Sequence, residues 1–90
     1  MSTRSVCVLM DLPPTQRYYV ATLAAIDHAA QALGAHVDVR VLRTDTLGDQ
    51  AEVLSSSAIL VGPGSPYGDP EAVLTSIRLA RERGIPLVGT

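Results

Sequence analysis

Four short apolar runs alternate along the chain with stretches in which apolar residues recur every three or four positions. The runs cover 5–10, 36–42, 58–61 and 85–90. Continuous apolar residues, as in 5–10 and 58–61, are typical of strands that are buried on both faces of a parallel sheet. The run 36–42 alternates instead between valine and polar residues, which predicts a half-exposed strand near a sheet edge.

Helical periodicity predicts two long helices between these strands. The apolar face of the first is formed by Tyr19, Leu23, Ile26, Ala30 and Leu33. That of the second is formed by Val73, Leu74, Ile77 and Ala80. We expect Thr15 to cap the first helix and Gly34 to end it. Asp69 as N-cap, Pro70 at the first helical position and Gly84 at the end delimit the second.

The order of these elements predicts an α/β fold with a flavodoxin-like parallel sheet of four strands and helices on both faces. Residues 44–57 are expected to form a loop and then a short helix around 50–54. In the flavodoxin-like order the second strand lies on one side of the first and the third on the other. Their carboxyl ends, at Asp11 and Gly62, then form the topological switch point, where a ligand site is expected.

Composition narrows the classes of function. Seven basic against nine acidic side chains give a net charge of −2, which argues against nucleic acid as the main partner. A hydrophobic content of 47% argues against disorder. No apolar run is long enough to span a membrane, and no secretion signal opens the chain. One cysteine and two histidines form no spaced metal cluster, so we expect a cytoplasmic chain without metal or cofactor.

The segment 62–68 is the most unusual one, because glycines and prolines follow a buried strand. Its backbone N–H groups could hold an anion or a developing oxyanion. It is no phosphate-binding Walker loop, since the chain has no lysine. A tight connection in which glycine and proline serve turn geometry alone is the alternative. Tyr67 is the aromatic residue placed to contact a ligand, and Asp11 is the acid at the switch point.

The remaining candidates for catalysis are weak. Cys7 lies in the middle of a strand and is expected to be a small buried hydrophobic residue. His28 and His36 are expected to be solvated. Of the adjacent Tyr18 and Tyr19, one should pack and the other should face water or a partner. The chain alone therefore contains no convincing catalytic set.

Residues 58–65 and 77–90 resemble a class I (triad) glutamine amidotransferase domain, most of all the domain attached to CTP synthase and its stand-alone relatives. The matching segments are Ala-Ile-Leu-Val-Gly-Pro-Gly-Ser and the helix with Ala-Arg-Glu that leads into Ile-Pro-Leu-Val-Gly-Thr. The resemblance covers 58–90 well, and 5–42 only as a general β-α-β start. It implies attack of a cysteine thiolate on the side-chain amide of glutamine.

The resemblance also implies roles for individual residues. The backbone N–H groups of Gly64 and Ser65 would form the oxyanion hole, although the family has glycine where this chain has Ser65. Gly89 and Thr90 would be the first two residues of the nucleophile elbow. Together with Asp11, the residues expected to bind substrate are Gly62, Pro63, Pro66 and Tyr67.

The nucleophile of that family would come directly after Thr90. We therefore expect residues 1–90 to be the N-terminal half of one domain, incomplete without a second polypeptide that carries the C-terminal half. Cleavage after Thr90 would turn the next residue into an N-terminal nucleophile. A split gene, a truncation or proteolysis at an exposed loop are the alternatives.

Three functions stay open at this point. The leading one is the oxyanion-loop portion of an enzyme that hydrolyses the glutamine side-chain amide. The second keeps the scaffold, with an N-terminal or elbow nucleophile, but acts as an amide or ester hydrolase or a transferase on another substrate. The third is a non-catalytic flavodoxin-like binding subunit.

Overall fold

A computed structural model describes residues 4–63 and 67–89. Its strands are β1 (Arg4–Leu9), β2 (Val37–Leu42), β3 (Ala58–Val61) and β4 (Leu87–Gly89). Its helices are α1 (Arg17–Leu33), the 3₁₀ turn η1 (Thr44–Thr46), α2 (Ala51–Leu54) and α3 (Pro70–Arg83). The strands pair in parallel in the order β2-β1-β3-β4. The predicted fold class, strand order and short helix near 50–54 are confirmed.

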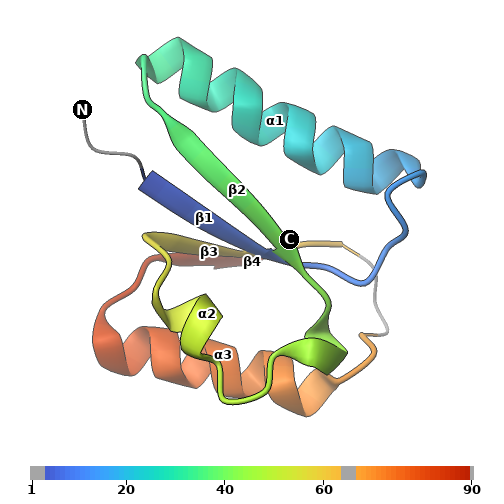
Figure 1. The fold of residues 1–90 in the computed structure, drawn as a ribbon, viewed down its shortest axis with the longest axis vertical. Helices are drawn as coiled ribbons and strands as arrows, with labels where there is room; N and C mark the ends of the chain where they lie inside the picture. The colour runs from blue at the N-terminus through green and yellow to red at the C-terminus, as the bar shows by residue number, and fades with distance from the viewer. Residues whose placement is uncertain (1–3, 64–66, 90) are drawn as a thin grey trace.

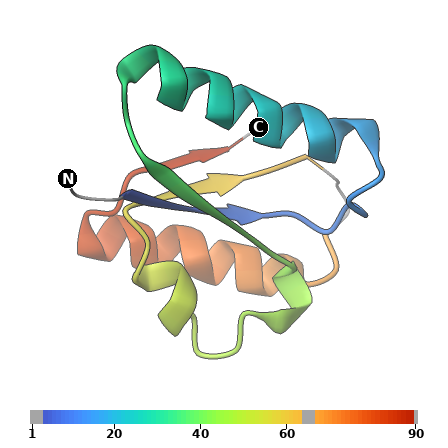
Figure 2. The ribbon, with the colours of Figure 1, turned by 45° about the horizontal axis from the view of Figure 1, so that its top comes forward.

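The helices form two layers around the sheet. Helix α1 covers one face, and α2 and α3 cover the other (Figures 1 and 2). The chain moves one way across the sheet from β1 to β2 and then the opposite way through β3 to β4. Because parallel crossovers are right-handed, this reversal places the connecting helices on opposite faces. The reversal also creates the switch point between β1 and β3.

The helix ends follow local sequence with one exception. Asp69 caps α3, since its Oδ1 accepts a hydrogen bond from the Ala72 backbone N–H at 3.1 Å. Gly34 and Gly84 end their helices with φ of 64° and 69°, as predicted. The prediction of Thr15 as the cap of α1 is wrong. A turn in which the Gln16 N–H donates to the Pro13 carbonyl (2.9 Å) delays the helix by one residue, and the Gln16 side chain is the cap.

The two faces of the sheet are packed unequally. The core lies between the sheet and the α2/α3 layer and consists of Cys7, Leu9, Leu47, Val53, Ile59, Val61, Val73 and Ala80. Under α1, by contrast, only Ala30 of the predicted apolar face is buried, and Leu33 is 82% exposed. On α3, Leu74 and Ile77 are exposed and Ser76 is buried instead. Much of the predicted apolar surface is therefore not covered by the described residues.

Candidate functional site at the sheet edge

The first and third strands end side by side, as the sequence predicts. The Gly62 N–H continues their ladder by donating to the Leu9 carbonyl at 3.0 Å. Gly62 is buried, and a Cβ placed on it would lie 3.1 Å from the Met10 sulfur. A larger residue here would therefore press on the Met10 side chain, which would have to shift by a few tenths of an ångström. The chain then leaves the sheet toward residues 64–66.

Asp11 lies at this edge and is engaged by three donors. Its Oδ1 accepts from the Thr44 backbone N–H at 2.8 Å. Its Oδ2 accepts from the Thr44 hydroxyl at 2.7 Å and from the Gly68 N–H at 2.8 Å. The Thr44 hydroxyl oxygen in turn accepts from the Asp69 N–H at 2.9 Å. Asp11 thus joins the ends of β1 and β2 to the start of α3.

These contacts determine the protonation state of the Asp11 carboxyl group. Partial burial raises the pKa of its carboxyl group. Hydrogen bonds from Gly68 and Thr44, together with the nearby Arg43 cation, outweigh burial and hold the pKa below its ordinary value. The group is therefore a carboxylate at neutral pH, as an acceptor of three hydrogen bonds must be.

Tyr67 closes the other side of the loop. Its hydroxyl donates to the Gly62 carbonyl at 2.9 Å, and its ring packs against the core. The phenol is half-buried. Tyr67 therefore links the two ends of the segment 62–67, and contact with a ligand stays a prediction.

Of the other predicted site residues, the structure describes Pro63 and Gly89. Pro63 is half-buried beside Gly62, and Gly89 is exposed at the end of β4. Gly64, Ser65, Pro66 and Thr90 lie outside the described residues. Their roles stay predictions.

No described residue is a credible nucleophile at this edge. Cys7 is 1% exposed in the middle of β1. Burial raises the pKa of its thiol to about 11, so the reactive thiolate is scarce at neutral pH. His28 and His36 are exposed, as predicted. In residues 4–63 and 67–89, no three His, Cys, Asp or Glu side chains gather as for a metal ion, and no helix could cross a membrane.

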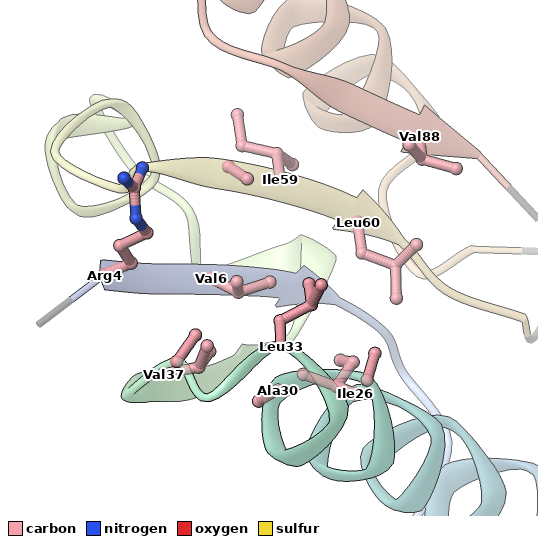
Figure 3. A pocket seen from close by; sticks show the side chains of 12 residues that line it. Arg4, Val6, Ile26, Ala30, Leu33, Val37, Ile59, Leu60 and Val88 are labelled. Atoms are coloured by element: carbon pink, nitrogen blue, oxygen red, sulfur yellow. The ribbon is translucent and has the colours of Figure 1, made fainter.

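Two apolar hollows lie on opposite faces of the sheet, and both reach β4. One, of about 410 Å³, opens between α1 and the sheet (Figure 3), where Ile26, Leu33, Leu60 and Val88 gather. The other, of about 550 Å³, lies between α3 and β4 and is lined by residues that include Tyr67, Leu74, Ile77 and Leu87. Their walls are apolar, so we interpret them as uncovered core and not as pockets for a polar substrate.

Sequence reasoning missed the polar contacts that connect distant segments. The Gln50 side chain donates to the Ala72 carbonyl at 3.0 Å and accepts from the Ser76 hydroxyl. Gln50 is also buried, with a left-handed φ of 69°. The contact between Asp11 and Thr44 spans 33 positions and that between Asp11 and Gly68 spans 57. No local pattern marks such pairs.

No protein-family model matches the chain. It is 29% identical over 75 residues to a CTP synthase of Levilactobacillus brevis, a match that covers 79% of this chain and 14% of that protein. It superimposes on the glutaminase domain of Trypanosoma brucei CTPS, solved with bound acivicin, with a TM-score of 0.77 and 23% identity. The chain has the fold of part of a CTP synthase glutaminase domain.

Both matches cover nearly all or most of this chain but a minor part of the matched protein. The superposition covers 98% of this chain but 36% of the solved glutaminase domain. The chain therefore spans about a third of the domain it superimposes on and a smaller share of the CTP synthase. The resemblance found in the sequence is confirmed as a partial one.

Proposed function

We propose that this chain is the oxyanion-loop portion of a glutamine-amidotransferase-like domain that hydrolyses the side-chain amide of glutamine. One observation carries the proposal: the chain leaves β3 at Gly62, at the switch point of a fold shared with a CTPS glutaminase domain. Ligands of open α/β sheets bind at such switch points. The sequence match to a CTP synthase supports the same reading.

The chemistry needs a nucleophile from beyond Thr90, because Cys7 is buried and protonated. A cysteine thiolate attacks the amide carbon of glutamine, and the oxyanion is stabilised by the N–H groups of Gly64 and Ser65. The carbon–nitrogen bond then breaks as the leaving nitrogen takes up the proton that the thiol had lost, and ammonia leaves. Water cleaves the thioester, which releases glutamate and restores the thiol.

The same proposal includes a partner. A second polypeptide carries the C-terminal half-domain and adds its core beside β4, where two apolar hollows adjoin one strand. Gly89 and Thr90 then lead into the nucleophile elbow. If the partner is produced by cleavage after Thr90, its first residue is a cysteine, serine or threonine, which sequencing of its N-terminus reads directly.

The decisive experiment measures ammonia and glutamate released from glutamine by the complete assembly. The variant Ser65→Pro lacks one backbone N–H, and removal of one oxyanion-hole donor lowers kcat about 10²–10³-fold. Ser65→Gly, which keeps the N–H, is the matched control and should retain activity. Wild-type protein that releases no ammonia refutes the function, and an active Ser65→Pro variant refutes the assignment of this donor.

A further inference from the structure

The segment that would bear the oxyanion hole is held at its far end by two side chains from other strands. Asp11 follows β1, and Thr44 follows β2. The Asp11 carboxylate accepts a hydrogen bond from the Gly68 N–H, and the Thr44 hydroxyl oxygen accepts one from the Asp69 N–H. Gly68 and Asp69 are the first residues after Tyr67. Two neighbouring amides of the loop end are thus fixed by residues 25 to 57 positions away.

Thr44 is the centre of this arrangement. Its side chain has no exposed surface. Its hydroxyl donates to Asp11 and accepts from Asp69, so each of its roles is filled. Removal of this hydroxyl would leave the Asp69 N–H and one lone pair of Asp11 without a partner, which is more costly than an exposed hydrogen bond.

The near end of the loop is held as well. The Gly62 N–H is part of the sheet ladder, and Gly62 also accepts from the Tyr67 hydroxyl. The loop therefore spans two anchored points, one on β3 and one on the pair formed by Asp11 and Thr44. Backbone donors stabilise an oxyanion only when they are held within a few tenths of an ångström of its position.

We propose that Asp11 and Thr44 are positioning residues, which set the place of the oxyanion loop without contacting the substrate. This rests on the proposed function. Three of the roughly four acceptor positions of the Asp11 carboxylate are filled by this chain's own N–H and O–H groups. In this proposal Asp11 acts through Gly68 and Thr44, as an alternative to the predicted direct contact with substrate.

The test compares two buried hydroxyl groups in the complete assembly. Thr44→Val removes the hydroxyl that holds the loop. Ser76→Ala removes one that is equally buried but contacts Gln50 and Ala72 and neither Asp11 nor Asp69. We expect Thr44→Val to lower kcat for glutamine at least about 10-fold with KM changed less than about 3-fold, because the interaction matters in the transition state. Thr44→Ser keeps both hydrogen bonds and should restore kcat.

Urea unfolding of the same variants separates positioning from folding. We expect Thr44→Val and Ser76→Ala to lose comparable stability, while Ser76→Ala keeps at least half of wild-type kcat. Equal losses of kcat in both variants, or unchanged kcat in Thr44→Val, overturn the positioning role while leaving glutamine hydrolysis intact. Wild-type protein without glutamine hydrolysis instead refutes the proposed function, and the inference with it.

Discussion

The uncovered surface around β4 leads to a prediction that compares two exposed valines. Val88 on β4 is 61% exposed and lines the hollow under α1. Val20 on α1 is 54% exposed and lines neither hollow. In the described fold, replacement of either by aspartate should change stability by less than about 0.5 kcal/mol, as for other surface positions. The effects of the two substitutions should differ only when a partner covers β4.

The expected difference follows from the exposed area. Full burial of a valine side chain is worth about 1.5–3 kcal/mol, so covering the exposed three-fifths of Val88 contributes about 1–2 kcal/mol. An aspartate there also brings an unpaired charge into the interface, which costs several kcal/mol more. Val88→Asp should therefore weaken association by at least about 3 kcal/mol, or roughly 100-fold in Kd. Val20→Asp should change Kd less than about 3-fold.

Isothermal titration of residues 1–90 with the polypeptide that carries the rest of the domain measures both values of Kd. Native mass spectrometry gives the stoichiometry. Equal affinities of Val88→Asp and wild type would show that β4 is not covered, and equal weakening by Val20→Asp would show that the loss is not specific to β4. A stable, well-folded 9.5 kDa monomer that binds no second polypeptide would refute the partner altogether.

Predictions for three further residues, Gly62, Cys7 and Asp11, test the packing and the charges. Gly62→Ala should destabilise the protein by about 1–3 kcal/mol in urea unfolding, because its Cβ would press on the Met10 sulfur. In a Met10→Ala background, Gly62→Ala should cost no further stability. Additive losses of stability in the double variant would contradict the contact. Cys7 should resist thiol reagents until the protein unfolds. Because its pKa is about 11 in the fold and about 8.5 in an unfolded chain, stability should fall as pH rises above about 8.5, and Cys7→Ala should flatten that limb. The lowered pKa of Asp11 contributes stability that is present above about pH 3.9 and is lost as pH falls through the folded value; Asp11→Asn should flatten this acid limb, and an unchanged acid limb would contradict the hydrogen-bonded carboxylate.

Short-range signals were reliable where the interaction itself is local. The N-cap at Asp69 and the left-handed ends at Gly34 and Gly84 depend on residues within one turn of the chain. The prediction for Thr15 was wrong because a turn from Pro13 moves the N-cap of α1 to Gln16, a competing local interaction that a preference for cap residues does not include.

Burial was less predictable than periodicity. Leu33, Leu74 and Ile77 lie at helical spacing on apolar faces, yet they are exposed in the described residues. The spacing of apolar residues shows which face of a helix can be buried, but a covering element must be present to bury it. In the proposed assembly, the second polypeptide supplies that covering element.

By itself the sequence determined the α/β class, the strand order and the point at which the chain leaves β3. Each of these depends on apolar periodicity, on glycine and proline in turns, and on the right-handedness of crossovers, which act along the chain. Only the tertiary structure decided that Asp11 meets Thr44 and Gly68, that Tyr67 closes on Gly62, and that Gln50 meets Ser76. Asp11 meets Thr44 and Gly68 because the segments that follow β1, β2 and β3 meet at one edge of the sheet, and Gln50 meets Ser76 because the start of α2 lies against α3. Such contacts between distant segments depend on three-dimensional proximity that no local pattern encodes.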